Sequence, residues 1–527
     1  MILVNNIKLS LDTDFNNLLS VLKSHSAFKG VSVNTAKLYK RSVDARKKED
    51  VHFCCSVLIS VSGNENKALK RLKNSKKYIE EKYDFKTVQN YSGTQPVVVG
   101  FGPAGIFAAY TLAKSGLKPI VLERGKPIDQ RTADVQSFWE GGNLNTESNV
   151  QFGEGGAGTF SDGKLTTGIK DRRSRTVLEI FHENGANKNI LTEAKAHIGT
   201  DVLALVIKNI REKIISLGGE IRFSSRLEKI KSKDGAVCSV EVSNNGSSYI
   251  LPCDRLILAI GHSARDTLYM LKDINIEMTR KPFAVGVRIE HKQDDINHSL
   301  YGSFANHPAL SAADYKLAVH LPSGRGVYTF CMCPGGFVVN ASSEDNRLAV
   351  NGMSYSLRDG ENANSALLCE VLPDDLHGDD VLAGIEFQRK LEQAAYHLSR
   401  GEGVPVQTVG SYVYGEDTPP IVTPTVKPRP VYADISEIFP DFINSSLREG
   451  IKAFGKKILG FDSKGAVLTV PESRSSCPVR ILRDSNFCSL SLKHLYPSGE
   501  GAGYAGGIMS AAVDGIKTAE AVIDSLL

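Results

Sequence analysis

Three glycine motifs are the residues of this sequence best suited to chemistry. The spacing G-x-G-x-x-G occurs at residues 100–105, 153–158 and 501–506. Glycines at this spacing let the backbone turn tightly and approach a phosphate closely, because no side chain stands in the way. The residues around each motif decide whether the chain binds three dinucleotides, two or one.

The first motif lies in a stretch, residues 97–125, that predicts a complete dinucleotide-binding unit. It begins with VVV, a run typical of a parallel strand buried on both faces. Gly100 makes the tight turn, Gly102 admits a pyrophosphate, and Gly105 lets the next helix pack on the strand and aim its N–H groups at the phosphates. A second strand, KPIVLE, ends at Glu123, 23 residues after Gly100, where a carboxylate is expected to bind ribose hydroxyls.

The second motif, QFGEGGAGTFSDGKL at residues 151–165, follows no apolar strand and precedes no convincing helix. Two interpretations stay open. The loop either cradles a phosphate or passes close to a planar ring through its unobstructed N–H groups, or it is a flexible connection. Ser161, Asp162 and Lys164 favour the first interpretation, because a passive connection does not need these polar side chains.

The third motif follows a short strand candidate, LKHLYPSGE, and precedes a helical stretch at residues 506–527. No further strand and ribose-binding acid follow, so a complete second dinucleotide domain does not fit. We expect instead one parallel sheet built from both ends of the chain, with two helix N-termini directed at a single long cofactor.

The remaining segments complete a four-part organisation. LILAIG, at residues 256–261, predicts a buried strand that ends at Gly261. From residue 276 to 480, the strand-like and helix-like stretches no longer alternate as strand and helix do in the nucleotide-binding fold. The sequence predicts an α/β protein: a Rossmann-like domain assembled from residues 94–275 and 481–527, an inserted α+β substrate domain at 276–480, and an N-terminal ferredoxin-like α+β domain at 1–90.

Composition excludes several other classes of protein. The longest apolar runs are far shorter than the ~20 residues of a membrane span, and the N-terminus lacks the features of a secretory signal. Nine scattered cysteines without a repeated C-x-x-C argue against a disulfide framework and a zinc site. We expect a cytoplasmic protein without a metal and without a membrane partner.

The charge of the chain is unevenly distributed. Residues 1–90 contain 17 Lys and Arg against nine Asp and Glu, a net charge of +8, whereas the remaining residues together have −4. This basic segment could attract nucleic acid. It is also compatible with an ordinary solvated helix face, because Glu80 and Glu81 interrupt the basic run.

Four stretches carry a resemblance to a known family: VVVGFGPAGIFAA, NVQFGEGGAGTFSDGKL, LILAIGHSARDT and YPSGEGAGYAGGI. Together they resemble the FAD-dependent dehydrogenases of the glutathione-reductase-like flavoprotein superfamily, and within it a bacterial group of uncharacterised FAD-dependent oxidoreductases. The likeness covers most of the chain, including FAVGVRIEH, CMCPGGFVV and PESRSSCPVRILRD. It implies that the Rossmann-like domain binds one extended FAD.

The resemblance also implies which residues contact FAD. The superfamily holds the ribityl chain with a C-terminal Gly-Asp motif, in place of which this chain has Gly499-Glu500. The helix that begins near Gly506 would stabilise negative charge on the reduced ring. The pyrophosphate would meet Gly100, Gly102, Pro103, Ala104 and Gly105; the adenosine would meet Glu123, Arg124, Ala259 and Gly261; the phosphate or isoalloxazine side would meet Gly156, Ala157, Gly158 and Thr159; the C-terminal contacts would be Gly499, Glu500, Gly506, Gly507 and Ile508.

Other residues have two interpretations each. Cys331 and Cys333 are either a redox pair or two packed cysteines, because the Cα atoms of such a pair in a regular strand lie about 6.5 to 7 Å apart, at the limit of disulfide reach. His262 is either a proton donor or a partner in a loop hydrogen bond. Arg288 either binds an anionic substrate or forms a structural ion pair. Substrate contacts are expected first in the polar loop 351–365.

These observations favour a FAD-dependent oxidoreductase that transfers hydride between flavin and a small organic substrate. NAD(P)H either binds transiently at the flavin, or electrons come from the substrate or from a protein donor. Two alternatives remain: an RNA-binding or RNA-modifying flavoprotein that uses the basic N-terminal domain, and a flavin-binding scaffold without catalysis. The substrate, the catalytic residues and the oligomeric state do not follow from the sequence.

Overall fold

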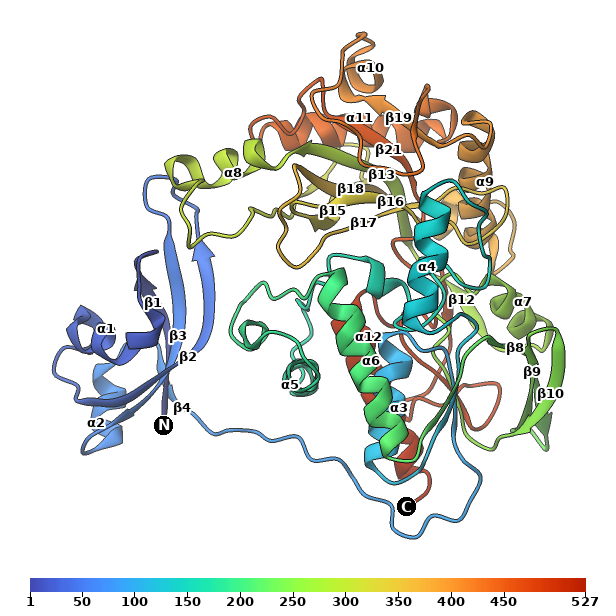
Figure 1. Ribbon diagram of the computed structural model, residues 1–527, viewed down its shortest axis with the longest axis horizontal. Coiled ribbons are helices and arrows are strands. Elements are labelled where there is room, and N and C mark those ends of the chain that lie inside the picture. Colours follow the sequence, from blue (N-terminus) through green and yellow to red (C-terminus); the bar gives the residue numbers. More distant parts are fainter.

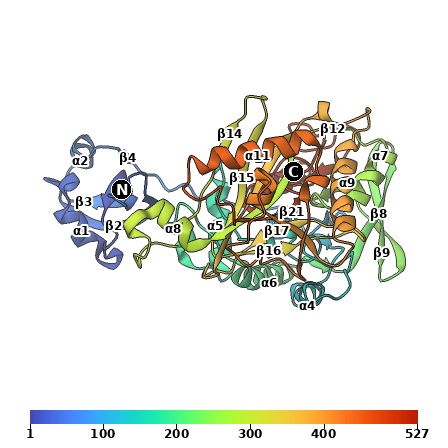
Figure 2. The same cartoon turned by 90° about the horizontal axis from the view of Figure 1, so that it is seen from above.

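The computed structural model describes residues 1–527 and divides into three parts (Figure 1). An N-terminal unit lies at one end of the molecule, a domain built on a parallel sheet contains the C-terminus, and a larger sheet domain lies above it. In the perpendicular view the N-terminal unit again projects from the end of the molecule, next to helix α8 (Gln293–Tyr301) (Figure 2). None of the helices combines the length and the apolar composition needed to cross a membrane.

The N-terminal unit is a four-stranded antiparallel sheet covered by two helices. Its strand order is β2-β3-β1-β4. Along the chain the order of its main elements is β-α-β-β-α-β, with β4 as a short last strand. The elements are β1 (Ile2–Leu9), α1 (Leu18–Ser24), β2 (Val33–Asp44), β3 (His52–Val61), α2 (Glu65–Arg71) and β4 (Ser75–Lys77).

Five short parallel strands form the second sheet, in the order β23-β11-β5-β6-β7. Leu256 pairs with Val97 on one side and with Leu495 on the other, so a strand from the C-terminal segment completes the sheet. The prediction of one sheet built from both ends of the chain is therefore confirmed. The strands are β5 (Val97–Val99), β6 (Ile120–Leu122), β7 (Glu220–Arg222), β11 (Leu256–Leu258) and β23 (Leu495–Pro497).

Both faces of this sheet are buried, which explains its unbroken apolar runs. Val98, Val121 and Ile257 face a core formed by the helices α3 (Pro103–Lys114), α5 (Arg173–Glu183), α6 (Thr200–Ser216) and α12 (Ile508–Asp524). The alternate residues of the same strands face a second core. That core includes the three-stranded sheet of β8 (Ser225–Lys233), β9 (Ala236–Asn244) and β10 (Ser247–Pro252), together with α7 (Arg265–Asp273).

The inserted domain contains a seven-stranded sheet in the order β14-β15-β18-β13-β21-β19-β20. The chain enters and leaves this domain through two paired strands, β12 (Met278–Arg280) and β22 (Val479–Ile481). The sheet strands are β13 (Phe283–Lys292), β14 (Ala318–His320), β15 (Gly326–Cys333), β18 (Asn362–Val371), β19 (Val404–Thr408), β20 (Pro430–Tyr432) and β21 (Val467–Glu472). A separate pair, β16 (Phe337–Asn340) and β17 (Val350–Met353), and the helices α9 (Ala383–Leu398), α10 (Val409–Tyr414) and α11 (Asp441–Gly455) pack around it.

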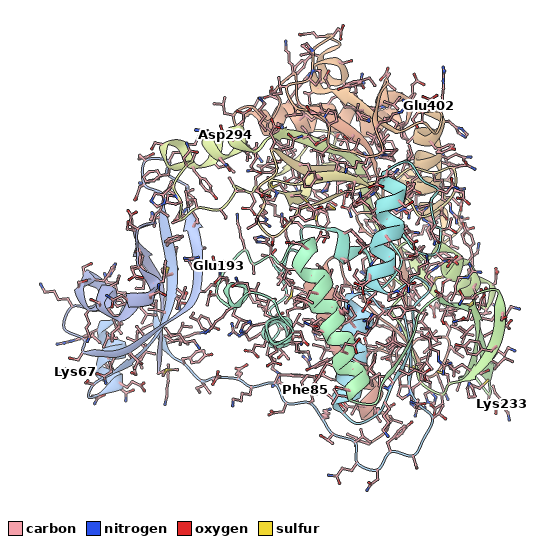
Figure 3. The ribbon with its side chains drawn as sticks, in the orientation of Figure 1. Lys67, Phe85, Glu193, Lys233, Asp294 and Glu402 are labelled. Atoms are coloured by element: carbon pink, nitrogen blue, oxygen red, sulfur yellow. The ribbon has the colours of Figure 1, made fainter.

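The N-terminal unit is joined to the rest of the chain by polar contacts. Arg41 exchanges backbone hydrogen bonds with the segment around Glu193, and its guanidinium donates to the Glu193 carboxylate at 2.6 Å. Figure 3 shows Glu193 between the N-terminal unit and the parallel-sheet domain. The segment that leads to β5 runs along α12, where the Tyr83 hydroxyl donates to Glu520 at 2.5 Å.

A buried ion cluster fixes the inserted domain against the parallel-sheet domain. Arg265 at the start of α7 and Arg474 after β21 both donate to the carboxylate of Glu392 on α9, at 2.8 to 2.9 Å. All three side chains are almost completely buried. Burial opposes ionisation of Glu392, but the two guanidinium groups outweigh it and hold the pKa of Glu392 well below its usual range. The carboxylate is therefore charged and holds two domains together.

We predict that Glu392→Gln lowers the melting temperature at neutral pH by roughly 5 °C or more, because two buried guanidinium groups lose the carboxylate that they share and keep only Glu344 as a counter-charge. The folded-state pKa of Glu392 lies below its unfolded value of 4.5, so its stabilisation is complete above pH 4.5 and declines as the pH falls. In thermal unfolding, the difference between wild type and variant should therefore be constant above about pH 5 and shrink progressively below about pH 4.5. Glu402→Gln, in an exposed ion pair with Arg429, is the matched control; a difference independent of pH would contradict the prediction.

A candidate dinucleotide cavity between two sheets

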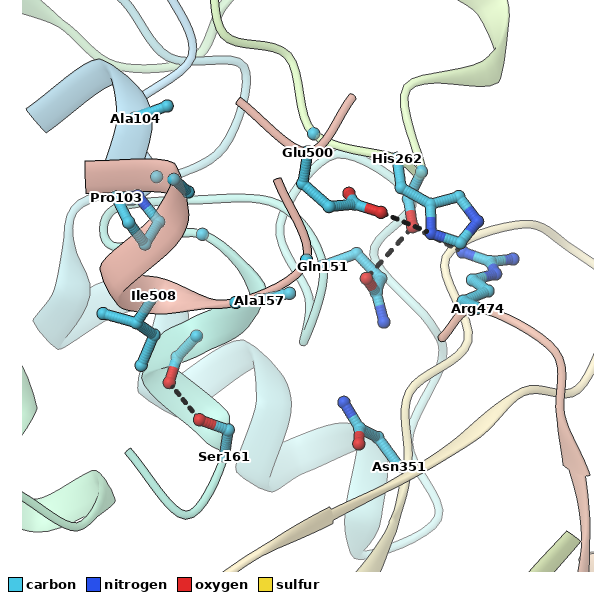
Figure 4. A pocket seen from close by; sticks show the side chains of 18 of the residues that line it. Pro103, Ala104, Gln151, Ala157, Ser161, His262, Asn351, Arg474, Glu500 and Ile508 are labelled. Carbon is cyan, nitrogen blue, oxygen red and sulfur yellow. Dashed lines mark hydrogen bonds and ion pairs between the residues drawn. The ribbon is translucent and has the colours of Figure 1, made fainter. Parts of the chain in front are cut away.

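One cavity of about 950 Å³ lies between the carboxyl ends of the parallel strands and the inserted sheet. This volume is near the upper end of the range of about 300 to 1,000 Å³ usual for ligand pockets. All three glycine motifs contribute residues to it, and so do strands β15, β17 and β21 of the inserted domain. Figure 4 shows Pro103, Ala157 and Ile508 on one side of this cavity and His262, Glu500 and Arg474 gathered on another.

The first glycine motif packs with no room for side chains. Gly100 has φ +95°, and a Cβ atom there would lie 2.3 Å from the carbonyl oxygen of Ala259 on the neighbouring strand. A Cβ at Gly105 would lie 1.9 Å from the carbonyl oxygen of Gly100. The turn after β5 and the close packing of α3 therefore both require glycine, for the reasons that the spacing predicts.

Glu123 fastens the first two glycine motifs to each other. Its buried carboxylate accepts hydrogen bonds from the backbone N–H groups of Phe101 at 2.8 Å, and of Gly125 and Gly153 at 2.9 Å each. The sequence predicts a ribose-binding role for this acid. The structure adds a role that the sequence analysis missed: the carboxylate lines the cavity and at the same time holds three backbone segments around it.

The second glycine motif is held from behind by Arg131 on α4 (Ile128–Trp139). The guanidinium of Arg131 is completely buried and donates to the carbonyl oxygens of Asn149, Val150, Gly153 and Glu154 at 2.6 to 3.4 Å. Burial lowers the pKa of Arg131 to about 10, which leaves it charged at neutral pH. The loop is thus a fixed wall of the cavity, which favours the first of the two interpretations of residues 151–165.

The third glycine motif shapes the far side of the cavity. A Cβ at Gly501 would lie 2.3 Å from the carbonyl oxygen of Gly261, so these two backbones touch. Gly506 and Gly507, just before α12, have no atom within 4 Å of an added Cβ and line the cavity. The same motif therefore combines close packing at its start with an open, glycine-lined surface at its end.

Two helix N-termini meet at this cavity. α3 and α12 pack side by side, and neither has a side chain that caps its N-terminus. The free N–H groups and the positive ends of both helix dipoles therefore favour an anionic ligand. Together with the glycine-lined walls and the cavity volume, this arrangement fits a dinucleotide with a pyrophosphate at its centre.

Most of the predicted site residues line the cavity, and three lie behind its wall. Gly105, Thr159 and Gly499 support the wall, because Gly105 abuts Gly100, Thr159 is completely buried, and a Cβ at Gly499 would lie 2.6 Å from the Ala104 side chain. The residues that line the cavity are Gly100, Gly102, Pro103, Ala104, Glu123, Arg124, Gly156, Ala157, Gly158, Ala259, Gly261, Glu500, Gly506, Gly507 and Ile508.

His262 and Arg124 have protein partners at the cavity wall. The Nδ1 atom of His262 lies 3.2 Å from Glu500, and its Nε2 atom lies 3.3 Å from the side chain of Gln388. This geometry agrees with the loop hydrogen bond considered for His262. Arg124 pairs with Glu147 and Asp266, and its guanidinium lies over the ring of Phe152 at 4.1 Å.

The part of the cavity that faces the inserted sheet contains an ionisable group, Glu472, that the sequence analysis missed. Glu472, at the end of β21, lines the cavity, and burial raises its pKa to about 7. Arg288 on β13 is completely buried and does not line the cavity; its Nε atom lies 3.7 Å from Glu472, too far for a hydrogen bond. The ion pair expected for Arg288 therefore exists, with Glu472 as its partner, but it is incomplete. Of the predicted loop 351–365, Asn351 and Arg358 line the cavity.

Comparison with known proteins agrees with this geometry. Residues 282–475 match a family model described as "FAD-dependent protein, C-terminal domain-like", and residues 1–60 match a domain of unknown function. An uncharacterized protein from Clostridium beijerinckii is 49% identical over 530 residues, which covers 99% of this chain and 98% of that protein. FAD is the cofactor that this family model names, and the cavity has the walls to hold it.

Solved structures with similar chain traces are distant. The glycerol-3-phosphate dehydrogenase from Bacillus halodurans complexed with FAD is 11% identical, with 82% of this chain and 64% of that chain covered and a TM-score of 0.35. A geranylgeranyl bacteriochlorophyll reductase-like protein from Thermoplasma acidophilum is 13% identical, with 82% and 79% covered and a TM-score of 0.34. The flavin-dependent brominase Bmp2 is 12% identical, with 82% and 79% covered and a TM-score of 0.39.

We predict that replacing Gly506 and Gly507 together with Leu removes FAD without unfolding the protein. Neither position has a φ in the left-handed region that favours glycine, and a Cβ atom added at either position meets no protein atom within 4 Å at the lining of the cavity. The FAD content of the purified variant should fall at least tenfold, with an unchanged circular dichroism spectrum. Gly326→Leu is the control, because it lies outside the cavity and its Cβ meets only the Glu370 side chain at 3.5 Å. Full FAD content in the double variant would contradict the prediction.

Proposed function

We propose that this chain, which belongs to the family of the Clostridium beijerinckii protein, is a cytoplasmic FAD-dependent oxidoreductase that transfers hydride between FAD and a small organic substrate. The single observation that supports this most is the continuity of the cavity. Its nucleotide-binding walls lead directly to a chamber lined by polar and ionisable groups of the inserted domain. A scaffold that only stores FAD does not need such a chamber.

The residues proposed to hold FAD are those on the three glycine motifs. Gly100, Gly102 and the N-terminus of α3 receive the pyrophosphate, and Glu123 and Arg124 lie toward the adenosine. The N-terminus of α12, from Gly506 to Ile508, supports the flavin end and favours the negative charge of its reduced form. When bound, FAD supplies two-electron hydride chemistry. The protein contributes orientation and exclusion of water.

Glu472 is the residue proposed to move a proton. It lines the chamber, its Oε2 atom is buried without a hydrogen-bond partner, and its carboxylate forms only the long contact with Arg288. Burial raises its pKa to about 7, where a carboxylate works efficiently as a general base. When the substrate is oxidised, Glu472 would remove the proton of an O–H or N–H group while hydride leaves the adjacent carbon.

The function is tested by anaerobic reduction of the purified holoprotein. In a screen of a metabolite library, we expect at least one class of metabolite, or NAD(P)H, to reduce the flavin and so to decrease its absorbance, because the chamber gives a small substrate access to the ring. Reduction by dithionite shows that the flavin can accept electrons in each sample. If dithionite bleaches the flavin and neither metabolites nor nicotinamides do so, the protein is a flavin-binding scaffold and the proposed activity is wrong.

We predict that the rate of substrate oxidation rises with pH through about pH 7, because Glu472 acts only as a carboxylate. The groups that face Glu472 are Arg288, on the neighbouring strand β13, and the thiol of Cys331 on β15. Glu472→Gln should lower kcat at least 100-fold, remove the ascending limb and leave FAD content unchanged. A pH profile with the same limb in the Gln variant would assign the proton transfer to another group.

A further inference from the structure

A bulge in strand β15 brings two cysteines together at the cavity wall. The register of β15 with β18 shifts between Phe330 and Cys333. Cys331 occupies the bulge with φ +42°, a left-handed conformation that costs free energy for any residue other than glycine. Cys331 lines the cavity, whereas Cys333 is completely buried behind it. A strained backbone at the wall of a cofactor cavity suggests a role for its side chain.

Contacts around the two sulfurs make them chemically unequal. The Cys333 thiol donates to the carbonyl oxygen of Cys331 at 3.2 Å, and Arg288 donates to that oxygen at 2.7 Å and to the Cys333 sulfur at 3.8 Å. The neighbouring Cys333 thiol, together with the positive charges of Arg288 and Lys164, lowers the pKa of Cys331 to about 6. Burial and the Cys331 thiol raise the pKa of Cys333 well above its usual value.

Two other buried cysteines, Cys253 and Cys477, serve as a comparison, because their environment is that of a thiol packed in a core. Cys253 and Cys477 are also free and buried, and burial raises the pKa of each thiol to about 12. No second thiol influences the pKa of either one. Around Cys331, by contrast, the Nε atom of Arg288 and the Oε2 atom of Glu472 are buried without hydrogen bonds, which is costly unless the site has a use for these groups.

We propose that Cys331 and Cys333 form a redox-active dithiol that exchanges two electrons with the FAD held in the same cavity. This inference rests on the proposed oxidoreductase function. In the oxidation, the two thiols lose two electrons and two protons, the first proton when Cys331 ionises; one S–S bond forms, and both electrons would pass to FAD bound in the cavity. The reverse reaction cleaves the S–S bond, takes up two protons and restores both thiols at the expense of reduced FAD. The balance needs no reactant other than FAD.

The positions of the two sulfurs determine which of them reacts first. Cys331 faces the cavity as a thiolate at neutral pH, so it is the sulfur that reacts first. Cys333 is shielded and protonated, and Arg288 next to its sulfur can stabilise the negative charge that appears when its proton leaves. The Cys333 sulfur already lies 3.2 Å from the carbonyl oxygen of Cys331, so the two residues are in contact before any S–S bond forms.

An anaerobic dithionite titration of the holoprotein tests the proposal. After mild oxidation with one equivalent of diamide, wild type should take up about four electrons per FAD, two for the flavin and two for the disulfide. Cys331→Ser and Cys333→Ser should each take up about two, whereas Cys477→Ser should behave as wild type. If wild type takes up only about two electrons per FAD while the flavin is fully reduced, the dithiol is ruled out and the oxidoreductase function still stands.

Alkylation gives a second measurement that does not depend on activity or on FAD. In diamide-treated wild type, Cys331 and Cys333 should both escape iodoacetamide, and mass spectrometry should find their peptide lighter by two hydrogens. In the reduced protein, the alkylation rate of Cys331 should show a midpoint near pH 6, and Cys333→Ser should move this midpoint upward by at least one pH unit. Two alkylated cysteines after diamide treatment, or an unmoved midpoint, would overturn the proposal.

Discussion

The close contact between backbone segments at the carboxyl end of the parallel sheet is the constraint on which the rest of the structure depends. Gly100 against Ala259 and Gly105 against Gly100 leave no space for a Cβ atom, and Glu123 ties both of the first two glycine loops to one carboxylate. A larger side chain at these points would separate the strands from α3. The cavity exists because its walls are bare backbone held at fixed distances by buried hydrogen bonds.

This constraint explains why the chemistry comes from the inserted domain. Bare backbone can hold a phosphate or a planar ring but cannot transfer a proton or an electron pair, so reactive side chains must come from another surface. The ion cluster of Arg265, Glu392 and Arg474 holds that surface at a fixed distance. Arg474 belongs to this cluster and also lines the cavity, so the interface between the domains and the site are one structure.

The sequence predicted the features that local spacing controls. The order of strand, glycines, helix and acid at residues 97–125 identified the nucleotide-binding unit. A strand, glycines and a helix near the C-terminus identified the last strand and α12. Both patterns could be recognised because they depend on neighbours along the chain. The sequence could not predict the roles of Arg131 and Glu472. Arg131 binds carbonyl oxygens about twenty residues away, and Glu472 meets Arg288 across two strands far apart in sequence. Contacts between residues far apart in the sequence cannot be predicted from the spacing of residues along the chain.

Cys331 shows how the two kinds of information combine. The C-x-C spacing raised the possibility of a redox pair, and regular strand geometry argued against it, because alternate residues of a flat strand lie near the limit of disulfide reach. The bulge removes that objection, since the strand is not regular at this point. A bulge costs hydrogen bonds and, here, a strained φ angle. Strand β15 keeps its register with β18 from Val327 to Phe330 and shifts it only where it reaches the two cysteines. The irregularity is therefore itself an argument that Cys331 faces the cavity for its chemistry.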